Sequence, residues 1–285
     1  MPSAKELVQS CSNIFTLPEI YLRVRNVVDD SNSTMDDLAN ALKLDPAISA
    51  RLLRIVNSPL YGFPKQIDTI TRAVNLIGMQ AVSDLVAATT IGRTFNGMTT
   101  DLMDLPGYWR KSALCALLAG KIAKACGIED SERFFIEGLL RDIGHLVLYQ
   151  TVPLRAQSAL VEAGNLGAVL AEVEQANIGC DFAEVGAELT HFWGMPAQIE
   201  HAIRHQLHPN EAGEFNLHAS IVHLAGTVAD HDEAAGDHAH ETPDFNAFAL
   251  SCTQFNPKSH AVLLEEARTQ LQDALASIYP AAIAA

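Results

Sequence analysis

Apolar residues recur with the period of an α-helix from one end of the chain to the other. No long stretch alternates with the period of two that is typical of a half-buried β-strand. Helix boundaries are also marked: Asp45-Pro46 places a capping carboxylate before a proline suited to the first helical turn. Gly78 is expected to end one helix and let Met79 begin the next. The pattern therefore predicts an all-α fold.

Length and charge set limits on function. The 285 residues can bury a large core, as one large domain or two smaller ones. The 19 basic and 34 acidic residues give a net charge of −15, which disfavours binding to nucleic acid or to an anionic membrane. The five cysteines form no CxxC pair, the first ten residues lack the apolar core of a signal peptide, and the apolar runs are short. We therefore expect a cytoplasmic protein with reduced thiols.

The most informative stretch is FFIEGLLRDIGHLVLYQ, residues 134–150, which is expected to lie in a helix covering 131–150. An i, i+4, i+7, i+11 spacing places four of its residues on one face: Phe135, Leu139, Asp142 and Leu146. A carboxylate on such an apolar face needs a partner, because unpaired burial costs several kcal/mol. Lys111 or Arg141 could supply it, so we predict that Asp142 forms a buried ion pair.

Two blocks together resemble a known family. The first runs from Asp45 to Val86, and the second from Tyr108 through EGLLRDIGHLVL to Pro209. Their order and spacing closely resemble the HDOD domain, a bacterial signalling relative of the HD superfamily of metal-dependent phosphohydrolases. The resemblance covers residues 14–230. Its most specific parts are the Asn57-Ser58 turn, Leu76-Ile77-Gly78 and the block Gly186…Trp193-Gly194…Pro196.

The resemblance implies a multi-helix fold with two packed lobes, an N-terminal lobe at 14–95 and an HD-like lobe at 106–230. Residues 95–106 would connect them, since Gly97, Thr99, Thr100 and Pro106 interrupt the helical pattern. The groove between the lobes is expected to take a partner or a small ligand. Residues 231–285 would form a mobile polar loop (231–241) and C-terminal helices that pack on the HD-like lobe.

The resemblance also implies a metal site. HD enzymes hold a divalent metal with a His, an adjacent His-Asp pair and a distant Asp, and the metal activates water against a phosphate ester. The matching positions here are Lys111, Arg141, Asp142 and Gly226; in addition, His145 stands where the family often has lysine, and His205 and His208 remain near the third helix. Protonated lysine and arginine are not usable ligands. We therefore expect no cofactor, no metal and no catalysis.

The preferred interpretation is a non-catalytic regulatory module of bacterial signal transduction with an unidentified protein partner. One alternative is a residual metal-dependent phosphohydrolase acting on nucleotides or cyclic dinucleotides. A second is nucleic-acid binding, because residues 35–58 resemble a helix-turn-helix with local positive charge. Arg51, Arg54, Asn57 and Ser58 form a candidate interaction motif there. We also predict that the helix stops within two residues of Asn57, whose side chain should bond to backbone.

Overall fold

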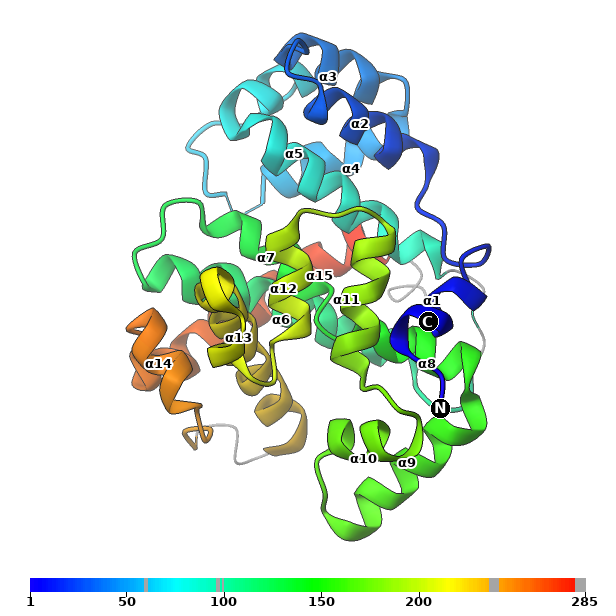
Figure 1. The fold of residues 1–285 in the computed structure, drawn as a ribbon. Coiled ribbons are helices and arrows are strands. Elements are labelled where there is room, and N and C mark those ends of the chain that lie inside the picture. Colours follow the sequence, from blue (N-terminus) through cyan, green and yellow to red (C-terminus); the bar gives the residue numbers. More distant parts are fainter. Residues whose placement is uncertain (59–60, 96–97, 99, 236–240, 280–285) are drawn as a thin grey trace.

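Helices make up the regular structure of this protein (Figure 1). The computed structural model describes residues 1–285 except 59–60, 96–97, 99, 236–240 and 280–285. The described residues contain no β-strand, which confirms the all-α class. Backbone hydrogen bonds are therefore satisfied within each helix, and the helices associate through their apolar faces.

The first part of the chain forms a layer of helices that lies at the top of Figure 1. Helix α1 (Ala4–Ser10) comes first in the chain, and the layer itself consists of α2 (Glu19–Asp29), α3 (Met35–Lys43), α4 (Pro46–Val56) and α5 (Ile70–Thr94). Helices α2, α3 and α4 pack against α5, and their inward residues Leu38, Ile48 and Leu52 are fully buried. Gly78 interrupts α5 with a φ of 83°, so the expected break in the helix occurs there as a kink. Helix α1 lies apart from this layer, against α8 and α11.

Among the remaining helices, α6 packs along α7, α13 and α15. Their bounds are α6 (Leu105–Ala125), α7 (Phe134–Leu139), α8 (Ile143–Thr151), α9 (Pro153–Leu166), α10 (Leu170–Asn177), α11 (Phe182–Phe192), α12 (Ala197–Arg204), α13 (Asn216–Ala235), α14 (Ala247–Thr253) and α15 (His260–Ile278). Short 3-10 turns lie at η1 (Ser131–Arg133), η2 (Pro209–Glu211), η3 (Gly213–Phe215) and η5 (Pro257–Ser259). Trp109, Leu117 and Leu118 of α6 are fully buried at the centre.

The prediction of one helix over 131–150 is wrong. The segment divides into η1, α7 and α8, and Asp142 is the residue that precedes α8. The turn redirects the chain so that α8 crosses α11 closely, with Gly144 against Gly186. A Cβ on Gly144 would lie 1.9 Å from the backbone oxygen of Phe182. Phe135 and Leu139 lie in α7, and Asp142 lies in the turn after it. The four residues that were predicted to share one helix face therefore do not lie on one continuous helix.

The prediction of a loop over residues 231–241 is wrong for its first five residues. Helix α13 continues through Ala235. Two carboxylates of this last part of the helix have partners, since Asp232 pairs with Arg268 and Glu233 pairs with Lys111. These ion pairs stabilise the last turn of α13, which has too few apolar residues to be recognised as helix from their periodicity. Residues 236–240, including His238 and His240, lie outside the described part of the chain.

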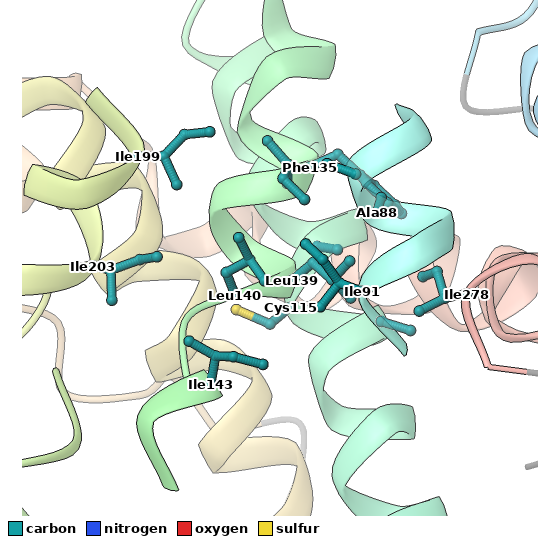
Figure 2. Packing of buried hydrophobic residues seen from close by; sticks show 14 of the residues in the cluster. Ala88, Ile91, Cys115, Phe135, Leu139, Leu140, Ile143, Ile199, Ile203 and Ile278 are labelled. Carbon is teal, nitrogen blue, oxygen red and sulfur yellow. The ribbon is translucent and has the colours of Figure 1, made fainter. Parts of the chain in front are cut away.

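The two segments that the sequence assigned to separate lobes share one continuous core. Figure 2 shows Ala88 and Ile91 of α5 in the same cluster as Cys115 of α6, Leu139 of α7 and Ile278 of α15. Helix α15 packs on α6 and also contacts α4 and α5, so it touches both segments and not the HD-like segment alone. The division into two lobes at residues 95–106 stays a prediction.

The start of the proposed connection is itself part of this core. Phe95 is buried, and its ring lies 4.7 Å from Phe15, 6.2 Å from Trp109 and 6.4 Å from Trp193, measured between ring centroids. The indole nitrogen of Trp193 donates a hydrogen bond of 2.8 Å to the backbone oxygen of Phe15. Aromatic contacts of this kind contribute beyond simple area burial. They tie the end of α5 to the loop after α1 and to the end of α11.

In the described residues, one helical stretch, Ile70–Gly92, is long and apolar enough to cross a membrane by length and composition. Within the fold, 56% of that window is buried. Residues such as Val74, Val82 and Val86 are fully buried against neighbouring helices. The apolar character of the stretch is accounted for by its place in the protein core.

Asn57 joins the end of α4 to the loop that leads into α5. The helix ends at Val56, as predicted, and within the described residues the Asn57 side chain bonds to backbone groups alone. Its amide nitrogen donates to the oxygens of Leu53 and Ile67, and its amide oxygen accepts from the Ile67 nitrogen, each at 2.7 Å. The side chain thus pairs both backbone groups of Ile67 in the loop and adds a second hydrogen bond to the Leu53 oxygen at the helix end.

Replacing Asn57 with alanine should destabilise the protein by roughly 2 kcal/mol, because three hydrogen bonds are lost and the Ile67 backbone groups lose their partner. Asn32→Ala is the matched control, since the Asn32 side chain bonds only to the nearby Asp30 in an exposed turn. It should change stability by less than about 0.5 kcal/mol. Urea unfolding of both variants measures the difference, and equal midpoints would show that the Asn57 clamp contributes little.

Candidate functional site

Three parts of the chain bring charged side chains together at one place. Lys111 projects from α6, while Arg141 and Asp142 occupy the turn between α7 and α8. Asp230 and Glu233 lie on the last turns of α13. Helix α6 packs against both α7 and α13, so these side chains meet where the three elements converge. We refer to these five residues as the ion-pair cluster.

Asp230 is the centre of the ion-pair cluster. Arg141 binds it with both terminal nitrogens, Nη1 to Oδ1 at 3.2 Å and Nη2 to Oδ2 at 2.7 Å. Lys111 Nζ lies 2.7 Å from Asp230 Oδ1. A planar guanidinium and a carboxylate that form two parallel hydrogen bonds fix each other in orientation as well as position. The pair therefore orders the turn that precedes α8 relative to α13.

Asp142 takes a secondary place in the cluster. Its Oδ2 accepts a hydrogen bond of 3.1 Å from Arg141 Nη1 and lies 3.9 Å from Lys111 Nζ. Both Arg141 and Asp142 have side chains that are only 11% exposed. The predicted ion pair of Asp142 is present, and both candidate partners contribute to it. Glu233 completes the cluster from the solvent side, 3.1 Å from Lys111 Nζ.

Gly226 makes room for the Arg141 side chain. It lies on α13, one turn before Asp230, and a Cβ at this position would be 2.3 Å from Arg141 Nε and 2.6 Å from Cζ. Atoms of these types cannot approach so closely, and Asp230 holds the guanidinium on the other side. The space that a side chain at position 226 would fill is therefore occupied by the Arg141 side chain.

The cluster stabilises the charged forms of Arg141, Lys111 and Asp230. Burial alone would lower the pKa of Arg141 and of Lys111, but the carboxylates of Asp142 and Asp230 outweigh it and raise both values. Burial alone would likewise raise the pKa of Asp230, but Arg141 and Lys111 hold it below its usual range. Both cations therefore keep their protons across the physiological range.

The cluster borders a cavity of about 600 Å³. Tyr149, His145 and Phe182 form an aromatic side of it; the His145 ring stacks on Phe182 at 4.3 Å and on Tyr149 at 5.5 Å between centroids. His145 Nδ1 lies 3.3 Å from Oε1 of the buried Glu174. The other Glu174 oxygen accepts a hydrogen bond of 2.9 Å from the Phe182 nitrogen. His145 is thus held by stacking and by a buried carboxylate.

The donor set does not suit a divalent metal. Such a metal would need unprotonated donors at the positions where Lys111 and Arg141 stand. Both side chains are cations that already engage the Asp142 and Asp230 carboxylates. Across the described residues, no group of three or more His, Cys, Asp and Glu side chains has an arrangement that could hold a metal ion. No catalytic step can be derived through a metal here.

The predicted site residues separate into two groups. Lys111, Arg141 and Asp142 meet in the cluster, Gly226 contacts Arg141, and His145 lines the same cavity. His205 ends α12 instead, where its ring stacks on His201 at 5.8 Å and burial lowers its pKa. It is not among the cavity-lining residues.

Three carboxylates of the site were missed in the sequence: Asp230, Glu233 and Glu174. Asp230 follows Gly226 by four residues and so lies on the same face of α13, one turn later. That spacing is the signal that could have identified it. Glu174 gave no such signal, because its place beside His145 depends on how α10 packs against α11.

The candidate interaction motif lies elsewhere, in the α3–α4 region. Helix α4 buries Ile48, Leu52 and Ile55 and packs against both α5 and α15. Arg54 and Ser58 border a small cavity of about 20 Å³ between α4, α6 and α15. Asn57 is used as the backbone clamp described above. A helix committed to the core on two sides is poorly placed to enter a DNA groove, which weakens the helix-turn-helix interpretation.

Gly226→Ala should destabilise the protein by roughly 1–3 kcal/mol, because the new methyl group must displace Arg141 from Asp230. Gly164→Ala is the matched control: Gly164 is also within a helix, but nothing lies within 4 Å of its missing Cβ. That variant should gain up to about 1 kcal/mol from better helix propensity. Denaturant unfolding compares the two, and a gain in both would contradict the packing of Gly226 against Arg141.

The sequence matches the family model of the HDOD domain over residues 14–209. An uncharacterized protein of Treponema pallidum (strain Nichols) is 25% identical over 229 residues, which are 78% of this chain and 43% of that protein. This chain thus spans less than half the length of that relative.

Two solved structures share the fold. A crystal structure named "Putative phosphohydrolase" from Shewanella amazonensis SB2B has a TM-score of 0.73 and 25% identity, covering 97% of this chain and 98% of that one. One named "Putative signal transduction protein" from Marinobacter aquaeolei VT8 has a TM-score of 0.66 and 20% identity, covering 96% and 64%. Because the family model matches most of the residues, this chain belongs to the HDOD domain family.

Proposed function

We propose that this protein is a non-catalytic HDOD regulatory module in which the ion-pair cluster replaces a metal centre. The observation that carries the proposal is the two-bonded contact of Arg141 with Asp230, together with Lys111 on the same carboxylate. A divalent cation at this position would be repelled by two fixed positive charges at short range. It would also have to displace hydrogen bonds that the buried Arg141 needs.

The proposed role is to bind a protein partner in bacterial signal transduction. Membership of the HDOD family supports this role, and so does the name of the Marinobacter aquaeolei protein that shares the fold. The ion-pair cluster is consistent with it, because cations paired with carboxylates keep α6, α8 and α13 in one arrangement without a bound ion. The rival role is a residual metal-dependent phosphohydrolase, which the name of the Shewanella amazonensis protein suggests.

The deciding experiment combines metal analysis with an activity assay. Protein expressed in medium supplemented with iron, manganese and zinc should carry none of them in stoichiometric amount, and chelators should leave its melting temperature unchanged. It should not hydrolyse phosphate monoesters, nucleotides or cyclic dinucleotides. One tightly held transition metal per chain, or turnover that disappears in Asp142→Asn, would establish the hydrolase instead.

Two sets of variants make the experiment specific. The double variant Lys111→His, Arg141→His places two imidazoles beside Asp142 and Asp230, so it should gain transition-metal affinity that the parent protein lacks. Asp142→Asn should lose about 1–3 kcal/mol of stability, because the nearly buried Arg141 loses one charged hydrogen-bond acceptor while Asp230 remains. Glu233→Gln is the control: this side chain is 67% exposed, and its loss should cost less than about 1 kcal/mol.

A further inference from the structure

A second cavity, of about 460 Å³, lies well away from the ion-pair cluster, at the kink of α5. Residues 76–84 of α5 form one side, and Tyr61 and Phe63 of the preceding loop form another. The third side comes from the other half of the chain, with Asp130 just before η1 and Arg133 at its end. Its volume is within the range of small-molecule sites. The Leu76-Ile77-Gly78 segment, whose pattern indicated the family, is therefore part of a cavity wall.

Much of the wall is apolar and part of it is aromatic. The Tyr61 and Phe63 rings are stacked in nearly parallel planes, with centroids 6.0 Å apart and an interplanar angle of 12°. Leu76 is 49% exposed although it lies on a core helix, and Ile77 and Met79 also line the space. The φ of 83° at Gly78 places these residues on the cavity side, because the helix changes direction there. Such a surface suits the apolar body of a ligand.

One carboxylate, Asp84, faces this cavity from α5. Its Oδ1 accepts a hydrogen bond of 3.0 Å from the Gln80 side chain. Within the described part of the chain, no lysine, arginine or histidine nitrogen lies within salt-bridge distance of Asp84, although Arg133 lines the same cavity. A smaller cavity of about 10 Å³ continues beneath Asp84 toward Phe135 and Ile136. Asp84 is thus a half-buried acid that borders the cavity and has no salt-bridge partner among the described residues.

We propose that this cavity binds a small organic cation with an apolar body, such as an arylalkylamine, whose ammonium pairs with Asp84. The aryl group would lie against the Tyr61 and Phe63 rings and the side chains of Leu76 and Met79. An ammonium near an aromatic face gains further stabilisation from the ring quadrupole. The cavity lining carries two acids, Asp84 and Asp130, against one base, Arg133, so its net charge also favours a cation. The proposal rests on this lining and is independent of the proposed function.

The chemistry of Asp84 supports the same ligand class. Burial, and to a smaller extent the charge of Glu137 on α7, raises the pKa of Asp84 to about 7, while Gln80 and Arg133 act in the opposite direction. Tyr21 of α2 also faces Asp84 closely enough for the carboxylate to raise the pKa of that phenol. Burial disfavours the charged form of the carboxyl, and Gln80 and Arg133 offset this only in part. An ammonium in contact with Asp84 would favour the charged form, so a bound cation should draw Asp84 into its ionised form.

The position of the cavity gives binding a structural consequence. The ligand would touch α5 and the loop before it on one side, and η1, which packs on α6, on the other. It would therefore bridge the two segments of the chain that the family resemblance assigns to separate lobes. Any change in their packing would be coupled to ligand affinity, because binding and conformation are thermodynamically linked.

The test uses calorimetric or NMR titration of the full-length protein with 2-phenylethylamine. Its uncharged analogue of the same shape, 2-phenylethanol, should bind at least roughly tenfold more weakly, because it brings no charge to the Asp84 carboxylate. N-acetyl-lysine amide carries the ammonium of a protein side chain without an aryl group and should also bind more weakly. The affinity for the amine should rise from pH 6 to pH 8, as Asp84 ionises while the amine stays protonated.

Matched variants identify the acid that is responsible. Asp84→Asn should abolish the preference for the amine over the alcohol, whereas Asp130→Asn, at the rim, should reduce it only slightly. Arg133→Gln removes the competing cation and should tighten amine binding, which gives a second readout if Asp84→Asn folds poorly. Far-UV circular dichroism checks each fold. Absence of saturable binding at millimolar amine, equal binding of amine and alcohol, or an unchanged preference in Asp84→Asn would each refute the proposal.

Discussion

The bond between Arg141 and Asp230 is the interaction on which the centre of this protein depends. A guanidinium that is only 11% exposed must have counter-charges and hydrogen-bond acceptors, and Asp230 provides both with a two-bonded contact. Its geometry in turn requires glycine at 226, because any larger side chain would occupy the space of the arginine. One ion pair thus sets the spacing between α13 and the turn before α8, and Lys111 extends the constraint to α6.

The same turn determines the packing of the next helix. Because α7 ends at Leu139 and α8 begins at Ile143, the chain changes direction and α8 crosses α11 with Gly144 against Gly186. The close crossing carries Phe182 to the His145 ring and Glu174 to its Nδ1 atom. The family resemblance places two of the four ligand positions of an HD-type metal centre, 141 and 142, in this turn. In this chain Arg141 and Asp142 take part in ion pairs there, so fixed side chains hold the turn in place.

The cavity beside the ion-pair cluster and the cavity at the kink of α5 differ in how closely their charged groups are paired. At the ion-pair cluster, two cations meet three carboxylates within 4 Å, so each charge has a partner. At the kink of α5, Asp84 has one amide hydrogen bond from Gln80 and a raised pKa of about 7. Carboxylates that are paired with fixed cations are suited to hold structure, and a carboxylate without a salt-bridge partner beside apolar space is suited to take a ligand. The regulatory role and the cation site are therefore proposed for different parts of the molecule.

The sequence by itself determined the helical class, the family, the stop of α4 at Asn57 and the partners of Asp142. Each of these depends on local periodicity, on turn chemistry or on a few charged positions within recognisable motifs. Only the tertiary structure decided the break between α7 and α8, the helical start of the supposed loop at 231–235, and the roles of Asp230, Gly226 and Asp84. Periodicity reports which face of a helix is apolar. It does not report where another helix crosses. That crossing decides which charged side chains form ion pairs and which have no salt-bridge partner.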